Sequence, residues 1–240
     1  LNSGISPIYE PGLDELIQKN HKAKRLHFTS NLKKAITVSD IIFICVGTPN
    51  IKGSLKVNLS FVFKCTKEIL SITKKKKIIV TKSTVPVGTG DQIENIIKKK
   101  RKLFSVISNP EFLREGEAIR DFRYPDRIVI GSNNKNEFKI MKKLYSPLIN
   151  KGAKFFSTSR RGAELIKYAA NAFLATKITF INEIANLCEK SGINVEDIAL
   201  GIGSDTRIGS RFLRPGPAYG GSCFPKDTKG LVSAAEKFKT

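Results

Sequence analysis

The runs Asp40-Ile41-Ile42-Phe43-Ile44-Cys45-Val46 and Lys77-Ile78-Ile79-Val80-Thr81-Lys82 decide the fold class of this sequence. Each run has the length of a strand and carries apolar residues at both parities, which is typical of a strand in a sheet that is covered on both faces. Helix-like segments stand between such runs. This alternation predicts an α/β protein with a doubly wound, Rossmann-like parallel sheet.

The same alternation extends outward from these two runs until residue 156. After that residue the apolar spacing becomes helical, which predicts one long helix over 159–191, a shorter helix over 195–201 and a last helix with Pro225 in its first turn. We therefore expect an incomplete sheet domain over 1–158 and a helical central domain over 159–240. The further predicted strands are 25–29, 104–107, 127–130 and 153–156, and the predicted helices between strands are 13–20, 59–73, 88–100 and 137–149.

A glycine-rich first turn is the usual opening of a doubly wound nucleotide-binding sheet, because glycines let a helix N-terminus approach a pyrophosphate. The 240 residues contain no G-x-G-x-x-G motif. The strand before such a turn normally lies in the middle of the sheet, so its absence would leave backbone groups of its neighbours unpaired. We therefore expect the domain over 1–158 to be incomplete, with a segment upstream of residue 1 lost.

Composition separates a globular chain from other classes. The sequence is 40% hydrophobic and 26% charged, which excludes a disordered tail. It has no apolar run of about 20 residues and no metal-binding pattern among its four cysteines. The first residues lack the basic and apolar regions of a signal peptide, so we expect none. We expect a protein of the reducing cytoplasm, without a membrane partner and without a metal.

The net charge is +21, from 42 Lys and Arg against 21 Asp and Glu. Most of the excess is lysine in short runs beside Ile and Asn, as in the run 74–77, which indicates a solvated basic surface. A nucleic-acid face and a site for a small anion are the alternatives. We expect no nucleic-acid partner.

Seven motifs occur in order along nearly the whole chain. They are Val46-Gly47-Thr48-Pro49, Thr81-Lys82-Ser83-Thr84-Val85-Pro86-Val87-Gly88-Thr89, Asn109-Pro110-Glu111-Phe112-Leu113-Arg114-Glu115-Gly116, Pro125-Asp126-Arg127-Ile128-Val129-Ile130-Gly131, Glu164-Leu165-Ile166-Lys167-Tyr168-Ala169-Ala170-Asn171-Ala172-Phe173, Phe180-Ile181-Asn182-Glu183-Ile184-Ala185-Asn186 and Gly220-Gly221-Ser222-Cys223-Phe224-Pro225-Lys226-Asp227. With Ile8-Tyr9-Glu10-Pro11-Gly12-Leu13 before them, they resemble the UDP-glucose/GDP-mannose dehydrogenase family.

The resemblance implies a reaction, a cofactor and an assembly. It implies the NAD-dependent, four-electron oxidation of UDP-glucose to UDP-glucuronate through a cysteine thioester, and a homodimer formed through the long helix. It also implies that a C-terminal UDP-binding domain is missing and that the chain alone is inactive. GDP-mannose or another nucleotide sugar as substrate, and a non-catalytic remnant of a split gene, are the alternatives.

Cys223 is the candidate nucleophile. It precedes Pro225 at the start of a predicted helix, beside Lys226, and a helix N-terminus and a nearby cation both favour a thiolate. The other three cysteines stand in apolar periodic segments, so we expect them to be small buried thiols. They are Cys45, Cys65 and Cys188.

Lys167 and Asn171 are four residues apart on the predicted long helix, so their side chains share one face. The resemblance implies that both bind substrate and stabilise the oxyanion, and that Lys167 is also a candidate proton acceptor. Asp227 lies one helical turn after Cys223, where it could hold a water or assist the base. The resemblance adds Lys226 as a cofactor-binding residue.

Glu111 and Glu115 would lie together if their segment were helical, because they are spaced i, i+4. The resemblance implies that Glu111 activates the water that hydrolyses the thioester and that Glu115 contacts NAD. Thr48 and Thr84 follow strands, at the edge where such sheets bind ligands, and their hydroxyls suit NAD. Thr84 is also expected to hold the water.

The loop 212–216 and Gly220 resemble the segment that wraps the sugar nucleotide, where glycines permit close backbone approach. Ala218 stands where the family usually has glycine, and a positive φ there would strain the backbone by roughly 1 kcal/mol. The expected substrate-binding residues are Glu111, Phe112, Leu113, Arg114, Glu115, Lys167, Asn171, Phe212, Leu213, Arg214, Pro215, Gly216 and Gly220.

Overall fold

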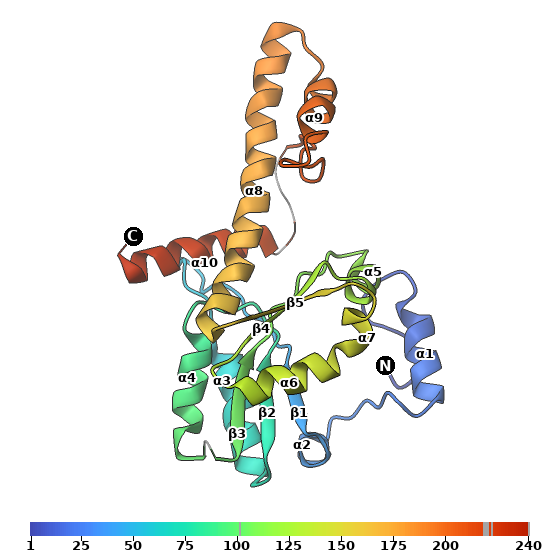
Figure 1. The fold of residues 1–240 in the computed structure, drawn as a ribbon, viewed down its shortest axis with the longest axis vertical. Coiled ribbons are helices and arrows are strands. Elements are labelled where there is room, and N and C mark those ends of the chain that lie inside the picture. The colour runs from blue at the N-terminus through green and yellow to red at the C-terminus, as the bar shows by residue number, and fades with distance from the viewer. Residues whose placement is uncertain (101, 218–220, 222, 240) are drawn as a thin grey trace. The chain divides into compact units, whose positions relative to one another are not determined.

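A computed structural model describes residues 1–100, 102–217, 221 and 223–239 of the chain. These residues divide into two compact units (Figure 1). Unit 1 comprises Leu1–Thr48 and Leu59–Glu164, and unit 2 comprises Pro49–Asn58 and Leu165–Thr240.

Unit 1 is built on a five-stranded sheet in the order β1-β2-β3-β4-β5. The first three strands are parallel, β4 runs antiparallel to β3 at the pair Ser108 and Gly131, and β5 runs parallel to β4. The α/β class is confirmed, but the sheet is mixed because of this one antiparallel junction. The strands are β1 (Ile41–Ile44), β2 (Lys77–Thr81), β3 (Phe104–Ser108), β4 (Arg127–Gly131) and β5 (Lys154–Thr158).

Helices cover both faces of this sheet, as the apolar residues at both parities predict. Neighbouring residues of β2 enter different cores: Ile79 packs in the core beneath α2, α3 and α4, and Val80 packs in the core beneath α6 and α7. The helices of unit 1 are α1 (Leu13–Lys22), α2 (Leu32–Val38), α3 (Ser60–Ile72), α4 (Thr89–Ile97) with a 3-10 turn over Lys98–Lys100, α5 (Ala118–Arg123), α6 (Lys135–Leu144) and α7 (Ser146–Ile149).

The predicted strand over 25–29 is wrong, since these residues form no strand. A strand needs a hydrogen-bonded neighbour, and no described strand lies beyond β1 to provide one. The prediction of a buried Cys45 is wrong for a related reason. Cys45 follows β1, the last strand on its side of the described sheet, and is exposed, whereas Cys188 is buried and Cys65 is partly buried.

A buried lysine, Lys77, is the first residue of β2. The Lys77 side chain is 4% exposed, and its ammonium group donates hydrogen bonds to the carbonyls of Thr37 (3.1 Å) and Ser39 at the end of α2. A cation is favourable there, because the last carbonyls of a helix carry partial negative charge. Lys77 therefore serves the packing of α2 at the end of the sheet opposite to the candidate site described below.

Unit 2 contains most of the long helix that the sequence predicts. This helix is α8 (Arg160–Ser191), and it is followed by α9 (Val195–Gly203) and α10 (Cys223–Phe238). A Cβ atom on Gly230 of α10 would lie 2.5 Å from the ring of Tyr168 on α8, so the close approach of these helices requires glycine. None of the helices in the described ranges has the length and apolarity that crossing a membrane needs.

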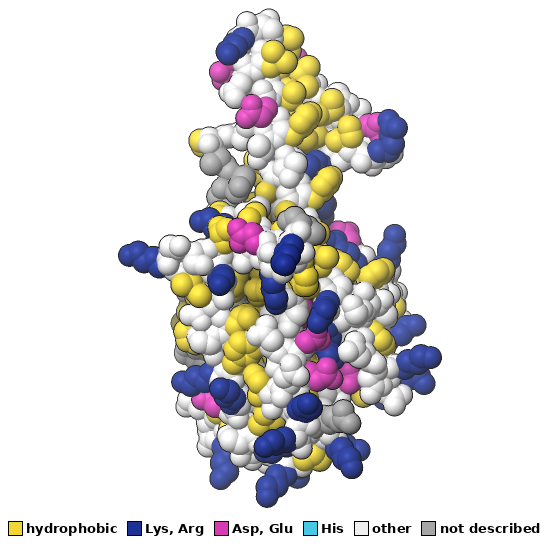
Figure 2. All heavy atoms as spheres, turned by 90° about the vertical axis from the view of Figure 1, so that its left-hand side faces the viewer, with side chains coloured by type: hydrophobic (Ala, Val, Ile, Leu, Met, Phe, Trp, Pro, Cys, Tyr) yellow, Lys and Arg dark blue, Asp and Glu magenta, His cyan; other side chains and the backbone are white. Residues whose placement is uncertain are grey.

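Lys and Arg side chains are distributed over the face of the molecule in Figure 2 and do not gather in one patch. A single groove lined by cations is the usual footprint of a nucleic-acid site.

Candidate functional site

The carboxyl ends of β1 and β2 bring two candidate residues together. Thr48 follows β1 and Thr84 follows β2, which is its parallel neighbour. The Thr48 hydroxyl donates a 2.7 Å hydrogen bond to the Thr84 carbonyl, and Thr48 is buried. The Ser83 hydroxyl donates to the Val46 carbonyl at 2.6 Å, which joins the two segments a second time. Unit 1 thus presents hydroxyl groups at the strand ends, where sheets of this class bind ligands.

Glu111 and Glu115 are not on a helix, so the paired arrangement expected for a helical segment does not form. The physical reason is local: the Glu111 carboxylate accepts a 2.7 Å hydrogen bond from the Leu113 backbone N–H, a turn-like contact that competes with helix formation. The helix of this region, α5, begins only at Ala118. Glu111 is partly buried and Glu115 is exposed.

Asn109 anchors the segment from which Glu111 extends. Its backbone N–H donates to the Thr81 carbonyl at 2.9 Å, and its side-chain amide donates to the Val129 carbonyl at 3.0 Å. The hydroxyl of Tyr145 donates to the Asn109 side-chain oxygen at 2.6 Å, and burial raises the pKa of Tyr145 to about 12. Asn109 is 1% exposed, so these bonds are made where water cannot replace them.

The expected substrate-binding residues 112–114 have protein partners in this structure. The Arg127 guanidinium lies 4.2 Å from the centroid of the Phe112 ring, and Leu113 is exposed. Arg114 donates two side-chain hydrogen bonds, of 2.9 and 2.6 Å, to Asp121, and it also forms an ion pair with Glu117. The bonds from Arg114 lower the pKa of Asp121. Arg114 therefore holds the segment to α5.

The sequence interpretation gave no role to Glu10, although it lies in a quoted motif. The Glu10 carboxylate accepts hydrogen bonds from the backbone N–H groups of Gly116 (2.9 Å) and Ala118 (2.8 Å), at the start of α5. Gly116 has φ +81°, a conformation that favours glycine. Glu10 fixes the end of the segment 111–116, and only the tertiary structure shows it, because its partners are more than 100 residues away.

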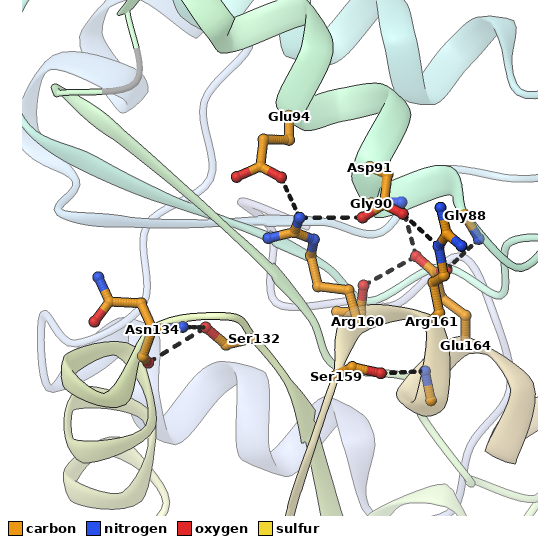
Figure 3. A network of polar contacts seen from close by, with 12 residues as sticks. Gly88, Gly90, Asp91, Glu94, Ser132, Asn134, Ser159, Arg160, Arg161 and Glu164 are labelled. Carbon is orange, nitrogen blue, oxygen red and sulfur yellow. Dashed lines mark hydrogen bonds and ion pairs between the residues drawn. The ribbon is translucent and has the colours of Figure 1, made fainter.

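The carboxylate of Glu164, near the start of α8, is a second group for which no role was predicted (Figure 3). It accepts hydrogen bonds from the backbone N–H groups of Gly88 (2.6 Å) and Gly90 (2.7 Å) and from the Ser108 hydroxyl (3.1 Å). Burial raises its pKa, and these bonds oppose that shift. An acidic residue beside apolar residues of the predicted long helix was the sequence feature that could have indicated a buried carboxylate.

In unit 2 the structure brings Asn171 and Asp227 together. The Asn171 amide donates a 2.6 Å hydrogen bond to one oxygen of Asp227, and the Lys226 ammonium is 2.6 Å from the other. Asp227 is 1% exposed and Lys167 is 4% exposed, so these polar groups are desolvated. Cys223 is exposed and is the first residue of α10, one turn before Asp227. The Lys226 ammonium forms its ion pair with Asp227.

The loop 212–216 contains an unusual backbone conformation. Phe212 has φ +66°, and its ring meets the ring of Phe224 edge-on at 6.0 Å. A positive φ at a bulky residue is strained, and such strain concentrates at ligand sites. Leu213 is buried, Arg214 is exposed, Pro215 is partly buried, and the Gly216 N–H donates to the Asn182 side chain at 2.9 Å. Gly220 and Ala218 lie outside the described residues.

Comparisons with known proteins show the family of the chain. Residues 1–149 match the family model described as UDP-glucose/GDP-mannose dehydrogenase family, NAD binding domain, and residues 161–240 match the central domain of the same family. The chain is 53% identical to UDP-glucose 6-dehydrogenase of Rhizobium meliloti, covering 100% of this chain and 56% of the relative. It is 50% identical to UDP-glucose 6-dehydrogenase YwqF of Bacillus subtilis, covering 98% and 53%.

Solved structures give the same picture. A UDP-glucose dehydrogenase from Pyrobaculum islandicum superposes with a TM-score of 0.93 at 36% identity, covering 99% of this chain and 56% of that one. A GDP-mannose dehydrogenase from Pseudomonas aeruginosa superposes with a TM-score of 0.78 at 35% identity, covering 99% and 56%. The chain thus spans about half the length of the relatives that it matches.

Proposed function

Because this chain belongs to the UDP-glucose/GDP-mannose dehydrogenase family, we propose that it carries the catalytic groups for the NAD-dependent oxidation of UDP-glucose to UDP-glucuronate. The observation that carries the proposal is the buried pair of Asn171 and Asp227, with the partly buried Lys226 on Asp227, which lies one helical turn after an exposed cysteine at the start of α10. A nucleophile at a helix N-terminus beside a desolvated acid and amide suits acyl chemistry.

The described residues fit the NAD cofactor of the family at the ends of β1 and β2. Thr48 and Thr84 place hydroxyl and backbone groups there, and these are the donors and acceptors that a nicotinamide amide and a ribose require. Glu115 and Lys226 are further proposed NAD contacts. NAD would take up the hydride removed from the sugar carbon, once for each of the two oxidation steps.

Cys223 is the proposed nucleophile in the second half of the reaction. After the alcohol has lost a hydride and a proton, the Cys223 sulfur adds to the aldehyde carbon and the carbonyl oxygen becomes an alkoxide. Loss of a second hydride leaves a thioester, and attack by water releases the carboxylate and restores the thiol. Two hydrides and the accompanying protons leave the sugar, so the oxidation transfers four electrons.

The remaining side chains supply charge stabilisation and proton transfer. We propose that Lys167 and Asn171 stabilise the oxyanion, because both are buried polar groups on one face of α8. Asp227, held by Asn171 and Lys226, is proposed to orient a base or a water. Glu111 is proposed to activate the hydrolytic water, assisted by the Thr84 hydroxyl. Residues 111–115, 212–216 and Gly220 are proposed to bind the sugar nucleotide.

The test of this proposal is an assay of the complete gene product with two sugar nucleotides. We expect UDP-glucose to give two NADH per sugar and UDP-glucuronate, with kcat/KM at least 100-fold above that for GDP-mannose. NADH release with GDP-mannose alone would refute UDP-glucose as the substrate and support GDP-mannose. The similarity to the Pseudomonas aeruginosa GDP-mannose dehydrogenase is the observation that favours this second substrate. No turnover with either sugar would leave a non-catalytic protein.

The long helix carries an apolar stripe that supports the proposed homodimer. Phe173, Phe180 and Leu187 recur every seven residues on α8 and are 65%, 50% and 62% exposed. Apolar side chains are visible along the helices of unit 2 in Figure 2. Exposed side chains at this period form one seam on a helix, which is the pattern of a helix that packs against another.

Phe180→Glu is expected to convert the dimer to a monomer, because a carboxylate in a helix seam is desolvated without a partner. Sedimentation equilibrium should show at least a tenfold rise in the dimer dissociation constant. Glu189→Lys, on the opposite side of the same helix and exposed, is the control and should stay dimeric. A wild-type protein that is monomeric at high concentration would exclude this interface.

A further inference from the structure

Glu164 binds backbone groups that are distant from it in the sequence. It lies near the start of α8, it is 3% exposed, and its two carboxylate oxygens accept three hydrogen bonds. Two of the donors are the N–H groups of Gly88 and Gly90, 76 and 74 residues earlier. A carboxylate that accepts several backbone N–H bonds in a buried place is held in a single orientation.

These two N–H groups belong to the start of α4. The first N–H groups of a helix have no partner within the helix, and Gly88, the residue that precedes α4, has no side chain that could supply one. Glu164 takes the place of that missing N-cap. The charge of the carboxylate also complements the positive end of the helix dipole.

The capped turn ends the segment that carries Thr84. At the other end of this segment, the backbone N–H groups of Lys82 and Ser83 donate to the Ile44 carbonyl at 2.9 and 3.1 Å. The residues between Ser83 and Gly88 are therefore fixed at both ends, by β1 and by Glu164. Without the carboxylate, the end next to α4 would lose the two hydrogen bonds that Gly88 and Gly90 donate.

The third bond of Glu164 reaches the strand that leads to Glu111. Ser108 is the last residue of β3, is 1% exposed, and is followed by the anchored Asn109. One carboxylate thus joins the segment of Thr84 to the segment of Glu111. The sequence places these two proposed catalytic residues 27 positions apart, and β2 and β3 bring them to the same edge of the sheet.

Arg160 also binds α4, through ion pairs with acidic side chains of that helix. Its guanidinium is 4% exposed and pairs with Asp91 (3.1 Å) and Glu94 of α4, while Arg161 pairs with Asp91 at 2.5 Å (Figure 3). A Cβ atom on Gly90 would lie 2.9 Å from Arg160 and 3.0 Å from Glu164. The approach is therefore so close that only glycine fits at position 90 without displacing these side chains.

We infer that Glu164 is a positioning residue for the proposed reaction, because its carboxylate fixes the segments of Thr84 and Glu111 relative to each other. The inference deepens the proposed function and rests on it for its effect on turnover. Glu164 is not proposed to touch substrate or cofactor. It acts through Gly88, Gly90 and Ser108.

The test compares Glu164→Gln with Lys77→Met in the full protein. Glutamine keeps the size of the side chain but turns an NH2 group toward a backbone N–H, so it cannot accept all three bonds. Lys77→Met also removes a buried charge, at the opposite end of β2. We expect Glu164→Gln to lower kcat/KM for NAD by about 10- to 100-fold, because small misplacements of catalytic groups have effects of this size, and Lys77→Met to change it less than twofold.

Amide hydrogen exchange supplies a readout that needs no substrate. In the 240-residue chain, Glu164→Gln should speed exchange at residues 88–90 at least tenfold, whereas Lys77→Met should leave it unchanged. The milder variant Ser108→Ala keeps both N–H bonds and should show protection close to wild type. It covers the case in which Glu164→Gln does not fold.

Each outcome decides one point. Unchanged exchange at residues 88–90, or an equal loss of turnover in Lys77→Met, would overturn the positioning role. If Glu164→Gln fails to fold, a fall in kcat/KM for NAD in Ser108→Ala at wild-type stability supports the role, and its absence overturns it. A wild-type protein without turnover would refute the proposed function, while exchange would still show whether Glu164 holds the turn.

Discussion

Cys223→Ser is expected to abolish the formation of UDP-glucuronate, with a loss of roughly 1,000-fold or more in kcat, as is typical when a covalent nucleophile is removed. Serine keeps the size of the side chain but is a far weaker nucleophile at neutral pH, since its hydroxyl stays protonated. Because Cys223 is exposed at the start of α10, the substitution should leave the folded structure intact. Uronate release is measured by chromatography, and folding by circular dichroism.

Cys65→Ser is the matched control for this experiment. Cys65 is a partly exposed cysteine as well, but it lies on α3 in unit 1 and packs at the border of the core. It should retain wild-type kcat with a small loss of stability. Undiminished uronate formation by Cys223→Ser would refute the thioester mechanism, and an equal loss in both variants would indicate a general effect of removing a thiol.

Gly131→Ala is expected to be the most destabilising small substitution in unit 1. An added Cβ would lie 2.7 Å from the Cβ of Ala163, 2.8 Å from the Cα of Arg160 and 2.8 Å from the carbonyl oxygen of Ser159. Two of these atoms belong to the backbone, so no side-chain rotation relieves the overlap. Overpacking of this kind costs roughly 1–3 kcal/mol, which should lower the melting temperature by about 3–9 °C.

Gly47→Ala is the control for the loss of glycine itself. No atom lies within 4 Å of a Cβ at that position, and Gly47 does not have a positive φ. Its melting temperature should stay within about 2 °C of wild type, because the alanine side chain meets nothing. If Gly131→Ala and Gly47→Ala have the same melting temperature, then β4 and the start of α8 are not closely packed.

Much of the fold could be predicted from residues near each other in the sequence. Runs such as 77–82 became strands because β-branched residues at both parities suit a sheet covered on both faces. The long helix appeared as α8 because its apolar spacing persists without proline. The strand over 25–29 failed because strand formation depends on a neighbour, which local sequence does not report. The boundary after residue 158 stays a prediction.

For the candidate site, the sequence indicates which residues take part, whereas the structure shows which residues contact them. The sequence by itself determined which residues resemble the catalytic set, among them Cys223, Lys167 and Glu111, because motif wording depends only on residue order. Only the tertiary structure decided what holds them: Asp227 with Asn171 and Lys226, Arg114 with Asp121, and Glu164 with the turn of α4. Asn171 is 56 positions from Asp227, and Glu164 is 76 positions from Gly88. Hydrogen bonds form by distance in space, so local sequence patterns contain no record of these two partnerships.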